Sequence, residues 1–256
     1  MVDLYAEIDR SDLLRYLFYP RRQHGKARDG AFDLAVDVAE NITIVCRAYP
    51  SGVKNPWILY FHGNGEVVSD YDGIAPLYKE RGLNLLVADY RGYGASGGSP
   101  TFTDMVVDAG KIFESVCNQL GKENESGKWF VMGRSLGSIS ALELAASYPD
   151  RLSGIIVESG FISIDRLIKH LGMPSPADLS PLEKAYRQLA EEINLPALVI
   201  HGQWDRLVPP EQGNELFQAL GSEEKNIVII PRADHNDIMF VDSQKYMDAI
   251  AGFVLN

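Results

Sequence analysis

Short apolar runs typical of β-strands alternate with longer runs typical of helices along most of this 256-residue chain. Such alternation is typical of a parallel sheet with crossover helices on both faces. Two runs near the N-terminus are joined only by Glu40-Asn41, which predicts an antiparallel hairpin that opens the sheet. We expect one mostly parallel sheet of eight strands over residues 31–39, 42–48, 57–62, 84–90, 128–133, 153–159, 196–202 and 225–231, with helices near 68–81, 102–120, 136–147, 211–220 and 237–253.

Residues 1–256 are expected to form a single domain, because this length is within the range of one large α/β domain. Two parts are additional to the sheet. Residues 1–30 form a polar N-terminal extension, and residues 161–194 form an insertion with two helical pieces around Gly172, Pro174 and Pro176. We interpret 161–194 as a short helical cap over a binding site. The alternative is a two-helix crossover that touches no ligand.

Charge and composition exclude several classes of function. The net charge of −11 disfavours nonspecific binding to nucleic acid or to an anionic membrane. The first residues lack a signal-peptide pattern, and no run approaches eighteen apolar residues, so we expect a cytoplasmic protein without an integral membrane segment. Cys46 and Cys117 are too few for a disulfide framework and are expected to be buried thiols. The oligomeric state is not predicted.

The segment Gly133-Arg134-Ser135-Leu136-Gly137 lies between a predicted strand and a predicted helix. A sharp strand-to-helix turn holds a serine hydroxyl clear of the backbone, where a neighbouring base can activate it. Glycines two residues to each side allow the turn to tighten and the helix to pack closely. The pattern predicts a nucleophile elbow with Ser135 as nucleophile, although a Gly-rich loop of any α/β domain could also produce it.

An acid and a base follow later strands, at the carboxyl edge where open α/β sheets place their sites. Asp205 follows the seventh predicted strand and His235 follows the eighth, so the chain order is Ser, Asp, His. Asp205 is expected to orient the imidazole of His235, which takes the proton of Ser135. The rival acids are Glu158, at the end of the sixth strand, and the two neighbours of the histidine, Asp234 and Asp237.

Two backbone N–H groups are expected to stabilise the oxyanion that forms when serine attacks a carbonyl. One belongs to Leu136, at the start of the helix after the elbow. The other belongs to the loop after the third strand, where we assign it to Asn64, with Gly65 as the alternative. His62 and His201 also end strands, and both are interpreted as structural because no metal-ligand spacing surrounds them.

The motifs FHGNGE, VADYRGYGASGGSP, GRSLGS, HGQWDRLVP and ADHND together resemble the α/β-hydrolase superfamily, in particular small α/β-hydrolase domain proteins with HGN-type oxyanion loops and GRSLG elbows. The similarity covers roughly residues 30–255. It implies the α/β-hydrolase fold, with Ser135, Asp205 and His235 as catalytic residues and oxyanion donors near Asn64 and Leu136. It also implies esterase, thioesterase, amidase or peptidase chemistry, and some relatives remove fatty acyl groups from proteins.

We therefore expect a serine hydrolase that cleaves carboxylic ester or thioester bonds of a small-molecule or acylated substrate through an acyl-enzyme, without a metal or cofactor. Trp204, Phe161 and Met239 are candidate substrate-binding residues because each lies near the predicted site and is apolar. One alternative is an amide or peptide hydrolase, such as an aminopeptidase, with the same triad. The other is a noncatalytic ligand-binding protein on the same fold.

Overall fold

The computed structural model describes residues 2–10, 14–28, 30–121, 126–173 and 178–256. Eight strands form one sheet in the order β1-β2-β4-β3-β5-β6-β7-β8, in which β1 pairs antiparallel with β2, β2 pairs antiparallel with β4, and every other pairing is parallel. This confirms the predicted sheet. The strands are β1 (Phe32–Ala39), β2 (Ile42–Tyr49), β3 (Trp57–Phe61), β4 (Asn84–Ala88), β5 (Trp129–Arg134), β6 (Gly154–Glu158), β7 (Ala197–Gly202) and β8 (Lys225–Ile230).

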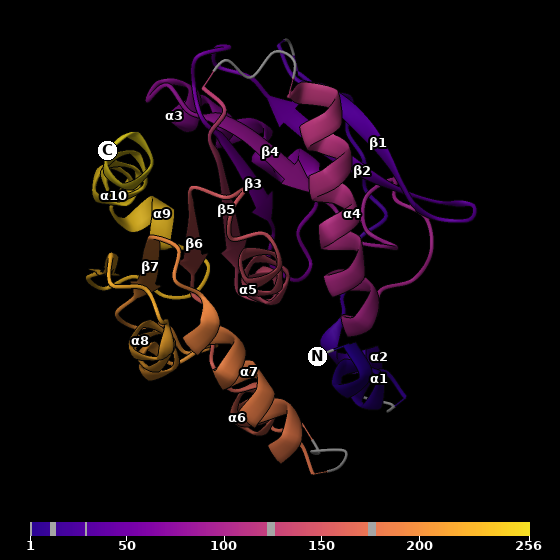
Figure 1. The fold of residues 1–256 in the computed structure, drawn as a ribbon, viewed down its shortest axis with the longest axis vertical. Helices are drawn as coiled ribbons and strands as arrows, with labels where there is room; N and C mark the ends of the chain where they lie inside the picture. The colour runs from indigo at the N-terminus through magenta and orange to yellow at the C-terminus, as the bar shows by residue number, and fades with distance from the viewer. Residues whose placement is uncertain (1, 11–13, 29, 122–125, 174–177) are drawn as a thin grey trace.

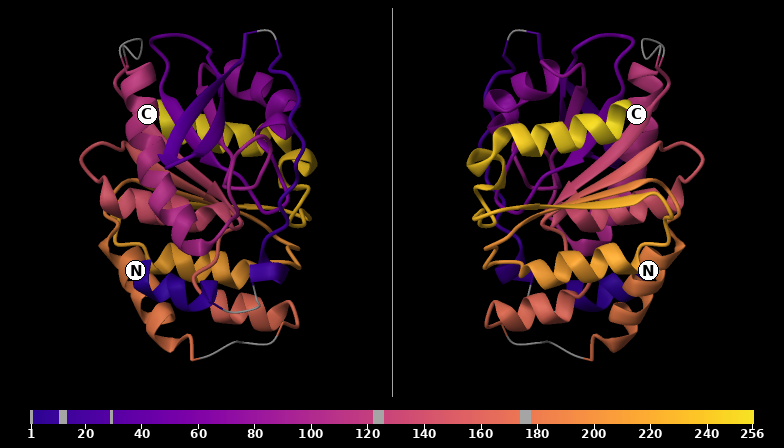
Figure 2. Two further views of the ribbon diagram at one scale, coloured as in Figure 1. Left: turned by 90° about the vertical axis from the view of Figure 1, so that its right-hand side faces the viewer. Right: turned by 90° about the vertical axis from the view of Figure 1, so that its left-hand side faces the viewer.

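Helices cover both faces of the sheet (Figures 1 and 2). The helices α4 (Phe102–Leu120), α5 (Gly137–Ser147) and α8 (Pro210–Ala219) pack on one face, while α3 (Ala75–Lys79) and α10 (Ser243–Leu255) pack on the other. Every residue of the central strands β3 to β7 is buried, as expected for a parallel sheet with covered faces. Alternate side chains of each strand therefore enter two separate apolar clusters.

A further layer of helices lies outside α4, α5 and α8 (Figure 2). It consists of α1 (Val2–Asp9), α6 (Ile164–His170) and α7 (Ser180–Glu192), with α2 (Leu14–Leu17) beside α1. The predicted insertion, 161–194, thus contains two helices; Gly172 follows the first, whereas Pro174 and Pro176 lie outside the described residues. Helix α7 packs against α5 and α8, and α1 packs against α4 and α7.

Two predicted helices are interrupted in the structure. Residues 68–81 form the 3-10 helix η1 (Val68–Gly73) followed by α3, and residues 237–253 form α9 (Ile238–Val241) followed by α10. The second break occurs at Asp242, whose carboxylate accepts a hydrogen bond from the N–H of Lys245 and so begins a new helix. A side chain that caps the backbone in this way competes with continuation of the preceding helix.

Candidate active site

Ser135 occupies a tight turn between β5 and α5. Its φ of 50° is in the left-handed region, which is unusual for a residue with a side chain, and its N–H donates to the carbonyl of Glu158 at 2.8 Å. The flanking glycines are required by close contacts: a Cβ on Gly133 would lie 2.4 Å from the carbonyl oxygen of Gly137, and a Cβ on Gly137 would lie 2.1 Å from that of Phe61. The turn therefore places the serine at the carboxyl end of β5, beside the end of β3.

The structure brings Ser135, His235 and Asp205 together in series. His235 Nε2 lies 3.0 Å from Ser135 Oγ, and His235 Nδ1 lies 2.7 Å from Asp205 Oδ2. All three residues are buried. Because an ionised carboxylate can only accept, Nδ1 carries the proton, which leaves Nε2 free to accept the proton of the serine hydroxyl.

Asp205 is held by several donors besides His235. Its Oδ1 accepts the N–H groups of Leu207 at 3.0 Å and Val208 at 2.8 Å, and Nε2 of His201 lies 3.3 Å from its Oδ2. Burial by itself would raise the pKa of Asp205, but the hydrogen bonds from His201, His235 and the Val208 N–H hold that pKa well below its usual value. The carboxylate therefore stays ionised opposite the imidazole.

The rival carboxylates have other partners. Asp234 accepts the N–H groups of Arg206 and His235 through its Oδ1, and Asp237 accepts the N–H of Asp234. Glu158 accepts hydrogen bonds from the hydroxyls of Tyr60 and Tyr246 and from Arg134. Of these carboxylates and that of Asp205, only Asp205 is hydrogen-bonded to the imidazole.

The two expected oxyanion donors lie in adjoining backbone segments. Leu136 begins α5, and a Cβ on the next residue, Gly137, would touch the carbonyls of Phe61 and His62, which directly precede the Asn64 loop. Within the described part of the chain, the N–H groups of Leu136 and Asn64 have no hydrogen-bond partner.

The neighbouring N–H groups of this loop are engaged. Gly63 donates to Glu66 Oε2 at 2.9 Å. The backbone of Gly65 opposes the rise in the pKa of Tyr93 that burial chiefly causes. Asn64, whose N–H has no partner among the described residues, remains our predicted second donor, with Gly65 as the alternative.

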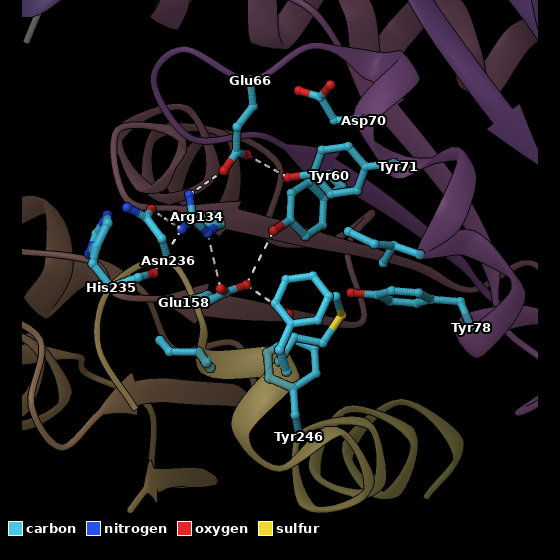
Figure 3. A pocket seen from close by; sticks show the side chains of 14 residues that line it. Tyr60, Glu66, Asp70, Tyr71, Tyr78, Arg134, Glu158, His235, Asn236 and Tyr246 are labelled. Carbon is cyan, nitrogen blue, oxygen red and sulfur yellow. Dashed lines mark hydrogen bonds and ion pairs between the residues drawn. The ribbon is translucent and has the colours of Figure 1, made fainter. Parts of the chain in front are cut away.

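A buried guanidinium joins the elbow to the histidine loop (Figure 3). Arg134 Nη2 donates to the carbonyl of His235 at 2.8 Å and to Asn236 Oδ1 at 3.0 Å, Nε donates to Glu158 Oε1 at 3.1 Å, and Nη1 pairs with Glu66. Burial opposes the charge of Arg134, yet Glu66 and Glu158 raise its pKa further above the usual value. This role of Arg134 was not predicted from the sequence. The signal was a cation directly before the serine, on a strand whose alternate side chains face opposite sides of the sheet.

A cavity of about 290 Å³ lies next to Arg134, His235 and Asn236. Figure 3 shows tyrosine side chains around it, and Met239, a candidate substrate-binding residue, is part of its wall. The other two candidates lie elsewhere. Trp204 is 55% exposed, whereas Phe161 is buried and its ring lies 6.5 Å from that of Tyr186.

The insertion borders the site at one point and packs on the helix layer elsewhere. His170, at the end of α6, lies with its Nε2 2.7 Å from the carbonyl of Arg206, the residue after Asp205. None of the described residues of 161–194 contributes to the cavity beside His235.

Comparison with known proteins identifies the class. The family model described as serine aminopeptidase, S33, matches residues 54–185 and 177–240. The protein bem46 of Schizosaccharomyces pombe is 31% identical over 211 residues, which cover 78% of this chain and 68% of that protein. An uncharacterized membrane protein of Saccharomyces cerevisiae, YNL320W, is 30% identical over 70% of this chain and 63% of its own length.

Solved structures agree on the fold. The esterase Pf2001 of Pyrococcus furiosus superimposes with a TM-score of 0.76 at 19% identity, over 92% of this chain and 98% of the esterase. A monoacylglycerol lipase of Paleococcus ferrophilus gives a TM-score of 0.66 at 20% identity, over 83% and 98% of the two chains. The protein is therefore an α/β-hydrolase. Within that superfamily, it belongs to the family described as serine aminopeptidase, S33.

Proposed function

We propose that this hydrolase cleaves carboxylic ester or thioester bonds through an acyl-enzyme on Ser135. The observation that carries the proposal is the unbroken hydrogen-bonded series from Ser135 Oγ through His235 to Asp205. Two of the structural neighbours are an esterase and a monoacylglycerol lipase, which supports ester chemistry.

In the acylation step, Ser135 Oγ attacks the acyl carbon while its proton moves to His235 Nε2. The carbonyl oxygen becomes an oxyanion that accepts hydrogen bonds from the N–H groups of Leu136 and Asn64. The bond to the leaving oxygen or sulfur then breaks, and His235 returns the proton to that atom. Asp205 stabilises the imidazolium that exists between the two transfers.

In the deacylation step, water takes the place of the leaving group. His235 removes a proton from the water, whose oxygen attacks the acyl carbon and forms a second oxyanion between the same two N–H groups. The bond to Ser135 Oγ breaks, the serine regains its proton from His235, and the carboxylic acid leaves. The proposed triad and the two backbone N–H groups carry out both steps.

An amide or peptide hydrolase with the same triad is the second candidate, and the name of the matching family favours it. An aminopeptidase needs a carboxylate to receive the substrate ammonium group. The three carboxylates that line the cavity beside His235 are already paired with arginines, Glu66 and Glu158 with Arg134 and Asp70 with Arg21, which supports the ester proposal. A noncatalytic ligand-binding protein is the third hypothesis, and the contact between His235 and Ser135 counts against it.

The decisive experiment combines labelling with turnover. A fluorophosphonate probe should form one adduct, located on Ser135 by mass spectrometry, and Ser135→Ala should abolish both the adduct and hydrolysis. Comparing p-nitrophenyl esters and acyl thioesters of graded chain length with aminoacyl anilides then separates ester from amide chemistry. Faster turnover of the anilides would replace our proposal with the peptidase, and absence of labelling would favour the noncatalytic protein.

The chain-length series also tests the assignment of Met239 to substrate binding, which we propose because Met239 and His235 line the same cavity. The roles of Trp204 and Phe161 stay predictions. In the described part of the chain, no helix is long and apolar enough to span a membrane. The cytoplasmic location suggested by the sequence likewise stays a prediction.

A further inference from the structure

The stretch Leu17–Arg21, here called the bracing segment, lies against the loop that carries Asn64. It comes from the N-terminal extension, for which the sequence suggested no role. Asn64 Nδ2 donates to the carbonyl of Leu17 at 2.7 Å, and Asn64 Oδ1 accepts the N–H of Tyr19 at 2.9 Å. The hydroxyl of Tyr93 donates to the same Oδ1 at 2.7 Å. The side chain of Asn64 thus makes three hydrogen bonds to residues 17, 19 and 93, while its backbone N–H is left without a partner among the described residues.

Arg21 holds the same loop one residue further along. Its Nη1 donates to the carbonyl of Gly65 at 3.1 Å, and its guanidinium pairs with Asp70 at 2.7 Å. The carbonyl of Arg21 itself accepts the N–H of Gly94 at 2.8 Å. With Gly63 tied to Glu66, contacts fix the peptides on both sides of Asn64.

The bracing segment is itself anchored to the core. Leu17 and Phe18 are buried, and the ring of Phe18 lies 5.1 Å from that of Phe102 at the start of α4. Nearby in the chain, the carboxylate of Asp9 accepts the N–H groups of Phe102 and Thr103 and so caps α4. The bracing segment therefore connects the start of α4 to the loop that carries Asn64 through direct contacts.

We propose that the bracing segment positions the Asn64 N–H for oxyanion stabilisation, so that Asn64, Arg21 and Tyr93 act as positioning residues. An oxyanion donor is effective only when it is fixed before the reaction. A loop with glycines on both sides of the donor has a large conformational freedom, and Gly65 indeed has a φ of +78°. The hydrogen bonds from residues 17–21 remove that freedom. This inference rests on the proposed function.

The test uses point variants, because deleting the segment would uncover core residues. Asn64→Ala retains the backbone N–H but loses all three side-chain hydrogen bonds. We expect kcat per labelled site to fall by about 10- to 100-fold, below the loss of about 10²- to 10³-fold for deleting a donor outright, while KM changes less than about twofold. Arg21→Ala should lower kcat by about 3- to 10-fold, because one of several anchors is lost.

Arg22→Ala is the matched control. Arg22 directly follows the bracing segment and also donates to backbone carbonyls, those of Ser96 and Gly98, but not to the Asn64 loop. Its kcat should stay within about twofold of the parent protein, since no contact to the donor is removed.

Affinity for an alkyl boronic acid, which mimics the tetrahedral oxyanion, distinguishes positioning from stability. In Asn64→Ala and Arg21→Ala the inhibition constant should rise in parallel with the loss of kcat/KM. Fluorophosphonate titration counts active sites, so partial unfolding would lower that count and leave turnover per site unchanged. If turnover per site and boronate affinity are unaffected although hydrolysis depends on Ser135, the bracing role is wrong. If hydrolysis does not depend on Ser135, the proposed function itself fails.

Discussion

The left-handed backbone at Ser135 should make this position prefer glycine once the hydroxyl is removed. We compare Ser135→Gly with Ser135→Ala, because both variants lose Oγ and its contact with His235. A side chain in the left-handed region costs about 1–2 kcal/mol, and Ser135 has a φ of 50°. Glycine relieves that cost but loses about 0.5–1 kcal/mol through the greater freedom of the unfolded chain. Taking the middle of each range, the glycine variant should unfold with a free energy about 0.7 kcal/mol higher than the alanine variant.

The same pair of substitutions at Ser115 is the control. Ser115 lies within α4, where glycine is less stable than alanine by about 1 kcal/mol. The sign should therefore reverse between the two positions, with a total difference of about 1.7 kcal/mol. Urea unfolding of the four variants measures this directly, and thermal melting should show shifts of about 2–4 °C per kcal/mol for a chain of this length.

The difference between the results at Ser135 and at Ser115 tests for backbone strain at the elbow. A difference between Ser135 and Ser115 below about 0.5 kcal/mol would show that the elbow stores no backbone strain, because independent sites add to within that error. Neither Ser135 variant should hydrolyse esters. The measured quantity is the free energy of unfolding, which does not depend on the identity of the substrate. An inactive Ser135→Gly protein that is more stable than Ser135→Ala would show that the strained backbone positions the hydroxyl and does not stabilise the fold.

Three further predictions concern the residues around Ser135. Asp205→Asn should lower kcat by about 10³- to 10⁴-fold, because the imidazole of His235 loses the partner that fixes its tautomer. Asp234→Asn is the control, and its kcat should stay within about twofold of the parent protein. Equal losses in the two variants would contradict the assignment of Asp205 as the acid. Because the fold lowers the pKa of Asp205, its carboxylate stabilises the protein above about pH 4, and this contribution is lost as the pH falls further. The difference in the free energy of unfolding between the parent protein and Asp205→Asn should therefore shrink between pH 7 and pH 3, as measured by urea titration. Arg134→Met should lower the free energy of unfolding by about 3–5 kcal/mol, because it leaves the buried carboxylate of Glu158 and the partly buried one of Glu66 without their cation. A loss below about 1 kcal/mol would show that these carboxylates find other partners.

The strands could be predicted because each depends on residues close together in the chain. Runs such as that of β3 are apolar throughout and end at turn residues, so their bounds agree with the structure to within a few residues. The elbow is also local, since its glycines and serine lie within five residues. The break between α9 and α10 was missed although it has a local signal, the capping carboxylate of Asp242.

The order of Ser135, Asp205 and His235 along the chain could be read from the sequence, but their contacts could not. Whether Asp205 or Glu158 meets the imidazole depends on which side of the sheet each carboxylate faces and on the partners already there. Glu158 is taken by tyrosine hydroxyls and by Arg134, a set of contacts that spans distant parts of the chain.

Sequence alone determined the elements, the elbow and the candidate residues, because hydrophobic period, turn chemistry and spacing are properties of neighbouring residues. Tertiary structure alone decided that Arg134 joins the elbow to His235, 101 residues away, and that the N-terminal extension holds Asn64, 45 residues from Tyr19. Such contacts arise when packing brings remote polar groups into a dry environment where each must find a partner. No local pattern in the chain specifies which partner that is.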